Sequence, residues 1–211
     1  MKDKIKTIIW IVVAIAIIVL IGILGYGYYK KATMEVKNPI LTMEVEGFGT
    51  VKMELYPDHA PQNVANIVNL ANRGFYNGTK FHRVIKDFMI QAGTKDGDGT
   101  TGAKLSDLKD GGEDKEYGIK GEFVANGVNN TIKFEEGVVG VARADYTQYS
   151  SDLKDESYNS GNAQFFIMTK ENTNLNGYYA AFGKVIEGMD VVDKIASVKT
   201  FMDSPYEKQV M

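Results

Sequence analysis

The chain has 211 residues, 44% hydrophobic and 24% charged, a composition typical of one globular domain with a short extension. Its net charge of −3 is uneven: the first 31 residues carry +4, which leaves −7 for the rest and argues against a nucleic-acid partner, because nucleic acid requires a basic surface. The absence of cysteine excludes disulfides, a thiol nucleophile and a cysteine-type zinc site.

The first distinctive element is an uncharged, largely apolar run over residues 7–29. At about 1.5 Å per residue, a helix of this length spans the ~30 Å hydrocarbon core of a bilayer. Trp10 lies near one end of the run and three tyrosines lie near the other, as in the aromatic belts of membrane interfaces. We therefore predict a membrane anchor over residues 1–31 and a linker over 32–38. A signal peptide that is cleaved after export, leaving a secreted protein, is the alternative.

Short strands dominate the remainder of the chain. Alternating residues on both sides of Gly47-Phe48-Gly49 predict a hairpin, and Pro61 opens a segment with an apolar stripe at helical spacing. The expected strands are 40–46, 50–56, two short strands within 81–93, 137–142, 164–168 and 180–186, and the expected helices are 62–72 and 189–195. Many short strands with only two helices predict a closed antiparallel barrel.

Two features of the chain suggest a metal site, but neither fits a metal-binding pattern. Asp96-Gly-Asp98-Gly is similar to the start of a calcium loop, yet Thr101 stands where the EF-hand requires glycine, and no glutamate closes the loop. The two histidines, His59 and His82, are not accompanied by a carboxylate motif. We expect no metal and, since no phosphate-binding glycine loop precedes a helix, no cofactor.

The segment Phe81–Gly93 mixes charged, polar and large apolar residues. Alternation along a strand puts Phe81 and Arg83 on one face. It also puts Met89 and Gln91 together on one face of the next strand. An arginine and a glutamine among such side chains must be paired or must face a cleft, because burial without partners is costly. A surface hairpin with an incidental arginine is the alternative.

This segment resembles the signature of the cyclophilins, which are peptidyl-prolyl cis-trans isomerases. A second block follows in the same order as in that family, about 70 residues further on, and two ordered blocks are far more specific than either alone. The block consists of Gln164-Phe165-Phe166-Ile167, then Leu175-Asn176-Gly177 and Phe182-Gly183-Lys184-Val185. The resemblance covers residues 39–211. It implies a mainly β fold, a closed eight-stranded antiparallel barrel capped by two helices.

The resemblance also implies a site built around Arg83. Rotation about an X–Pro bond crosses a barrier of ~18–20 kcal/mol and needs an apolar pocket, backbone donors and a cation that favours the twisted state. The guanidinium of Arg83 can donate to the prolyl nitrogen once amide resonance is lost. The residues implied in substrate binding are His82, Phe88, Met89, Gln91, Ala142, Arg143, Gln164, Phe166, Leu175 and Tyr179. Ordinary core packing is the alternative for Phe166 and Leu175.

Three positions depart from the usual pattern of the family. Arg143 stands between Ala142 and Ala144, where cyclophilins usually carry asparagine. Tyr179 replaces a common histidine, and Asn174 replaces a tryptophan of many members. Because cyclophilins make the substrate contact at this position chiefly through the backbone, the resemblance implies that this arginine alters substrate preference without abolishing binding.

The sequence therefore predicts a bacterial, membrane-anchored peptidyl-prolyl isomerase that helps proline-containing exported proteins to fold. Its predicted partners are those proteins and, through residues 7–29, the lipid bilayer. Because the apolar run resembles an export signal, we expect the catalytic domain on the extracytoplasmic side of a single-pass anchor. A cyclophilin-like binding module, or a chaperone for proline-containing segments with little turnover, is the alternative.

Overall fold

The structure, a computed structural model, describes residues 2–33 and 37–205. It divides the chain into two compact units, Met1–Lys37 and Asn38–Met211. The remaining positions, which include part of the predicted linker and the last residues of the predicted isomerase domain, lie outside this description.

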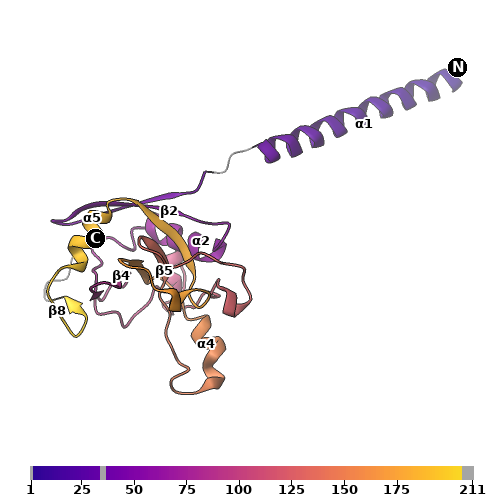
Figure 1. Cartoon of the computed structure of the whole chain (residues 1–211). Helices are drawn as coiled ribbons and strands as arrows, with labels where there is room; N and C mark the ends of the chain where they lie inside the picture. Colours follow the sequence, from indigo (N-terminus) through magenta and orange to yellow (C-terminus); the bar gives the residue numbers. More distant parts are fainter. Residues whose placement is uncertain (1, 34–36, 206–211) are drawn as a thin grey trace. The chain divides into compact units, whose positions relative to one another are not determined.

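The first unit is dominated by one long helix, α1 (Lys2–Thr33), shown in indigo in Figure 1. Within it, Trp10–Tyr29 is a 20-residue stretch that is long and apolar enough to cross a membrane, and none of it is buried. A helix that is apolar all round suits a hydrocarbon environment. A signal sequence near an N-terminus has the same properties, so the helix is compatible with the predicted anchor and with the cleaved alternative.

The second unit is built on one seven-stranded antiparallel sheet in the order β1-β2-β7-β5-β6-β4-β3. Its strands are β1 (Ile40–Val45), β2 (Gly49–Leu55), β3 (Arg83–Ile85), β4 (Met89–Ala92), β5 (Val138–Val141), β6 (Phe165–Met168) and β7 (Ala181–Glu187). The prediction of a closed, eight-stranded barrel is wrong, because the sheet is an open half-barrel. Closure requires the end strands to be joined, and within residues 37–205 β1 and β3 pair neither with each other nor with an eighth strand of the sheet.

A small separate ribbon contacts the outer edge of β3. It consists of β8 (Thr200–Phe201) and β9 (Ser204–Pro205) and is drawn in yellow in Figure 1. The backbone N–H of Val84 donates to the carbonyl of Asp203 at 2.7 Å. This bond satisfies a donor of the edge strand and holds the turn of the ribbon against β3.

The predicted N-terminal hairpin of the domain is confirmed as β1 and β2. Its turn requires glycine, because Gly47 and Gly49 have φ of 74° and 126°. Ile40 pairs with Glu54 and Val45 with Gly49, and this register turns alternate side chains of both strands into the core.

The two predicted helices are confirmed as α2 (Pro61–Asn72) and α5 (Met189–Ala196). The prediction of only two helices in the domain is too low, because α3 (Leu105–Leu108) and α4 (Lys154–Tyr158) are also helical. Three short 3₁₀ segments, Val124–Asn126, Ser151–Leu153 and Thr173–Leu175, accompany them. These pieces are too short for periodicity in the sequence to predict them.

The first turn of α2 is capped by a side chain from a distant loop. Glu122 is 2% exposed, and its carboxylate accepts the backbone N–H groups of Gln62 and Asn63 at 3.0 and 2.9 Å. A negative group at this end is stabilised by the unpaired N–H groups and by the helix dipole. Pro61 has no N–H of its own to satisfy there.

The main core lies between the sheet and the helices α2 and α5. The positions of Phe81 and Arg83 relative to this core differ from the prediction. Phe81 is fully buried in this core, whereas the side chain of Arg83 is 45% exposed. The two do not share a face, because β3 begins only at Arg83 and strand alternation does not extend back to Phe81. A second buried cluster consists of Met89, Phe134, Val138, Phe166, Met168 and Ala181.

Candidate functional site

A hollow of about 430 Å³ gathers ten of the eleven residues that the sequence analysis implicates. These are His82, Arg83, Phe88, Met89, Gln91, Ala142, Arg143, Phe166, Leu175 and Tyr179. The exception is Gln164, which lines an adjacent hollow of about 300 Å³. The fold therefore brings the two sequence blocks together in one place.

The register of four neighbouring strands aligns the key side chains. Arg83 of β3 lies opposite Gln91 of β4, and Gln91 lies opposite Phe166 of β6. Phe166 lies opposite Gly140 of β5. A Cβ atom on Gly140 would be 2.5 Å from the Phe166 ring, so only glycine leaves room for that ring. The result is a row that runs from a cation through an amide to an aromatic ring.

The floor of the hollow is aromatic and firmly packed. Phe166 is 5% exposed and stacks on Phe134, with ring centroids 5.5 Å apart. Tyr179 meets Phe166 edge to face at 5.8 Å. Phe88 and Leu175 pack against the same cluster. Such a surface can hold a small apolar ring by burying it without creating unpaired polar groups.

Two arginines line the hollow, and Arg143 is the more constrained. Its guanidinium lies over the rings of Tyr179 at 4.6 Å, Tyr158 at 5.1 Å and Phe123 at 5.7 Å. It also donates to the hydroxyl of Ser157 at 3.0 Å. Tyr158 and Ser157 belong to α4, drawn in orange at the lower end of the domain in Figure 1. Arg143 thus ties the α4 segment to the wall of the hollow.

Arg83 is held differently. Its side chain is 45% exposed, and its Nε atom lies 3.8 Å from Oδ2 of Asp203 in the turn of the β8–β9 ribbon. Among the described residues, Asp203 is the one ion-pair partner of Arg83. Arg83 is therefore the lining cation whose guanidinium is open to a bound molecule.

A chain of amides connects the row to the loop that follows β4. Gln91 donates from Nε2 to Oε1 of Gln164 at 2.9 Å, and Gln164 donates from its own Nε2 to the carbonyl of Gly99 at 3.0 Å. Gly99 has φ of 90°, and a Cβ atom there would lie 2.6 Å from the His82 ring. Gln164 thus stands behind Gln91 and orients its amide, although the sequence analysis places Gln164 among the substrate-binding residues.

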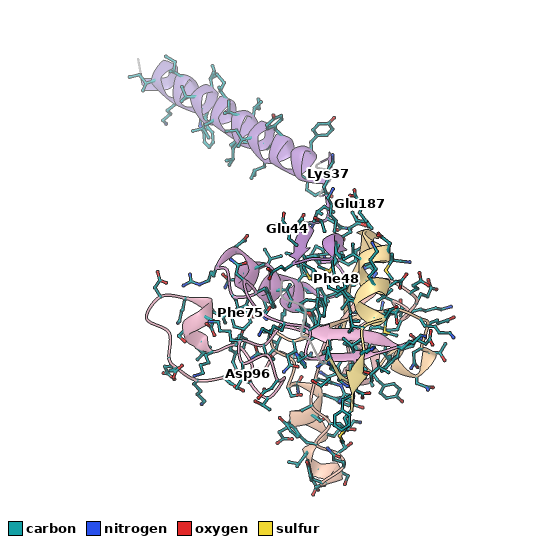
Figure 2. All side chains as sticks on the ribbon, turned by 90° about the vertical axis from the view of Figure 1, so that its left-hand side faces the viewer. Lys37, Glu44, Phe48, Phe75, Asp96 and Glu187 are labelled. Carbon is teal, nitrogen blue, oxygen red and sulfur yellow. The ribbon has the colours of Figure 1, made fainter. Side chains whose placement is uncertain are left out.

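Asp96, which is labelled in Figure 2, accepts hydrogen bonds from the loop that supplies Gly99. Its carboxylate accepts the backbone N–H groups of Asp98 at 3.1 Å, Gly99 at 3.3 Å and Thr101 at 2.9 Å. Burial alone would raise the pKa of Asp96, but hydrogen bonds from the Thr101 side chain and from the N–H groups of Asp98 and Gly99 outweigh it and hold the pKa well below its ordinary value. The loop is therefore folded around an ionised carboxylate.

Five of the described lining residues were not predicted as site residues: Asp98, Gly99, Met202, Asp203 and Ser204. The last three lie far from either block of the signature, in a ribbon of two-residue strands that carries no periodic signal. Among the residues that the structure describes, no three His, Cys, Asp or Glu side chains gather in a group that could hold a metal ion.

Comparison with known proteins identifies the family. Residues 40–211 match the model of the family described as cyclophilin type peptidyl-prolyl cis-trans isomerase/CLD. The "Probable peptidyl-prolyl cis-trans isomerase" of Brucella suis is 40% identical over 156 residues, which are 70% of this chain and 66% of that protein. The mouse "Peptidyl-prolyl cis-trans isomerase-like 1" is 34% identical over 153 residues, 72% of this chain and 76% of the relative. The chain therefore belongs to the cyclophilin type peptidyl-prolyl cis-trans isomerase family.

The fold has solved counterparts. A crystal structure of a Cryptosporidium parvum cyclophilin type peptidyl-prolyl cis-trans isomerase, in the presence of the dipeptide Ala-Pro, superimposes with a TM-score of 0.66. It covers 82% of this chain and 95% of the other, at 24% identity, and shows a common fold. The match to the Brucella relatives, at 66% of their length, spans just under two thirds of those proteins.

Proposed function

We propose that the second unit catalyses the cis–trans isomerisation of X–Pro peptide bonds, with Arg83 as the catalytic residue. The observation that carries this proposal is the row from Arg83 through Gln91 to Phe166, in a chain that belongs to this family. The row joins a half-exposed guanidinium to an aromatic floor, which are the two surfaces that a twisted prolyl bond requires.

The reaction needs no bond cleavage. Rotation breaks amide resonance at a cost of ~18–20 kcal/mol, and the prolyl nitrogen then gains an available lone pair. The guanidinium of Arg83 donates to that nitrogen, so that it stabilises the twisted state more than either planar state. Phe88, Met89, Phe166 and Leu175 receive the proline ring, while the amide of Gln91 holds the neighbouring peptide backbone.

We further propose that the substrates are proline-containing segments of exported proteins. The dipeptide named for the Cryptosporidium structure supports a proline-containing ligand. The unburied apolar stretch Trp10–Tyr29 supports a single-pass anchor, and secretion after signal cleavage is the alternative. We propose the extracytoplasmic side for the domain because the apolar run resembles an export signal. Protease added to intact cells without their wall should degrade the domain, and full protection would refute this orientation.

The catalytic proposal is tested with the full-length chain in detergent micelles and a short peptide that contains one Ala-Pro bond. Two-dimensional exchange NMR measures the cis–trans rate, which without a catalyst is one event per tens to hundreds of seconds. We expect exchange that grows with protein concentration and is much slower in Arg83→Ala. Peptide binding without faster exchange would instead favour a binding module.

A further inference from the structure

The turn of the β8–β9 ribbon has an unusual backbone. Met202 and Asp203 have φ of 49° and 65°, the left-handed region that glycine, asparagine and aspartate adopt most readily. A methionine there is strained, and such strain persists where surrounding contacts impose it, often at functional sites. Met202 is also 86% exposed, so packing of its side chain in a core does not explain the conformation.

Two contacts from one residue hold this turn beside the catalytic arginine. The carbonyl of Asp203 accepts the N–H of Val84 at 2.7 Å. The carboxylate of the same residue lies 3.8 Å from Nε of Arg83, the neighbour of Val84 in β3. Asp203 therefore touches both the backbone and the side chain of the strand that carries the arginine, and Ser204 and Met202 continue the wall of the hollow.

We propose that Asp203 is a positioning residue for Arg83, an inference that rests on the proposed function. An arginine side chain has several rotatable bonds, and a half-exposed one without a partner is distributed over many rotamers. The carboxylate lies within ion-pair distance on the Nε side of the guanidinium, so that the terminal nitrogens remain available to donate to the prolyl nitrogen. Preorganising the donor removes the cost of ordering it during the reaction.

Charge and exposure set the size of the effect. The two side chains are 45% and 51% exposed, and their 3.8 Å separation makes them an ion pair without a hydrogen bond. Exposed pairs of this kind contribute little individually. The loss of the carboxylate should therefore lower the rate several-fold, far less than the loss of the arginine itself.

The test variant is Asp203→Asn in the full-length chain, because asparagine tolerates left-handed φ and has nearly the same size. We expect kcat for peptide exchange to fall about two- to fivefold, with KM unchanged. Asp190→Asn, which removes the exposed partner of Lys194 on α5 at 2.8 Å, is the matched control and should leave both constants unchanged. If Asp203→Asn folds poorly, Asp203→Gly replaces it, since glycine relieves the strained φ.

A double-mutant cycle separates positioning from a purely structural role. In an Arg83→Ala background, Asp203→Asn should have no further effect, because the side chain that it orients is gone. An equal fall in both backgrounds, an unchanged rate, or a faster rate that marks Asp203 as a restraint on the cation would each overturn the inference. These outcomes differ from failure of the proposed function, in which Arg83→Ala alone would leave the rate unchanged.

Discussion

At the scale of single residues, the side chain of Arg83 is half-exposed, so its removal should affect the reaction and not the fold. We expect Arg83→Ala to lower turnover by about 10²–10³, or ~3–4 kcal/mol, as for the loss of a preorganised donor at a transition state. Peptide affinity should change much less, and the fold should survive, since the side chain fills little of the core. Arg83→Lys should not restore turnover, because the compact ammonium group of lysine lacks the planar, multi-donor geometry of the guanidinium.

Exchange NMR and a peptide titration on the same samples measure the rate and the affinity, and circular dichroism checks the fold. Arg73→Ala is a suitable control, because that arginine pairs with Asp110 and does not line the hollow. A folded Arg83→Ala protein that exchanges proline at nearly the wild-type rate would remove Arg83 from the mechanism.

Phe88 should behave in a different way from Arg83. Its ring packs against the cluster beneath the hollow, so Phe88→Ala removes apolar surface that, under the proposed function, receives the proline ring in both planar and twisted states. We expect affinity to fall by roughly 30-fold, about 2 kcal/mol, with kcat/KM falling in parallel. Phe48→Ala is the control, since this half-buried phenylalanine lies at the β1–β2 turn (Figure 2). A loss of kcat with unchanged affinity would contradict the assignment.

At the scale of elements, the loop after β4 depends on a single carboxylate. Asp96→Ala removes the acceptor of the N–H groups of Asp98, Gly99 and Thr101. We expect faster amide hydrogen exchange in residues 97–101 and a several-fold higher KM, because Gly99 no longer holds Gln164 in place. Asp193→Ala, an exposed carboxylate of α5, should change neither quantity.

The pH dependence of this loop follows from the lowered pKa of Asp96. A carboxyl group with a depressed folded-state pKa contributes stability above its unfolded pKa of about 3.9 and loses it as pH falls through the folded value. The loop should therefore exchange amides with unchanged protection between pH 5 and 8 and loosen only in strong acid. Loss of protection near neutral pH would show that the carboxylate does not hold the loop.

At the scale of the whole molecule, the second unit should be independent of the first. In the part of the chain that the structure describes, its main core, its second cluster and a third cluster of Leu70, Phe75, Ala103 and Ala163 are formed by residues from Leu41 onward. A chain that begins at Asn38 should therefore be soluble, folded and as active on a peptide as the full-length protein in micelles. Sedimentation, circular dichroism and the exchange assay check this, and an insoluble or inactive domain would show that the N-terminal unit contributes to folding.

Much of this molecule follows from local sequence patterns. Proline at the start of α2, the glycine turn of the first hairpin and the apolar stripe of α5 act over a few residues, so the periodicity of the sequence locates these elements. The signature residues that line the hollow were implied by the resemblance to the cyclophilins and not by periodicity. Arg83, Gln91 and Phe166 must meet once β3, β4 and β6 pair in this register.

Other features depend on contacts between distant segments, and only the tertiary structure decided them. The sheet is open because strand closure is a property of end-to-end geometry, which no local pattern encodes. Gln164 stands behind Gln91 because the loop around Asp96 presents a carbonyl to it. Asp203 reaches Arg83 only because a two-residue turn is tied to the edge of β3, more than 100 residues earlier in the chain. Long-range pairing of this kind is set by packing and by hydrogen bonds at strand edges, and the periodicity of the sequence does not report either.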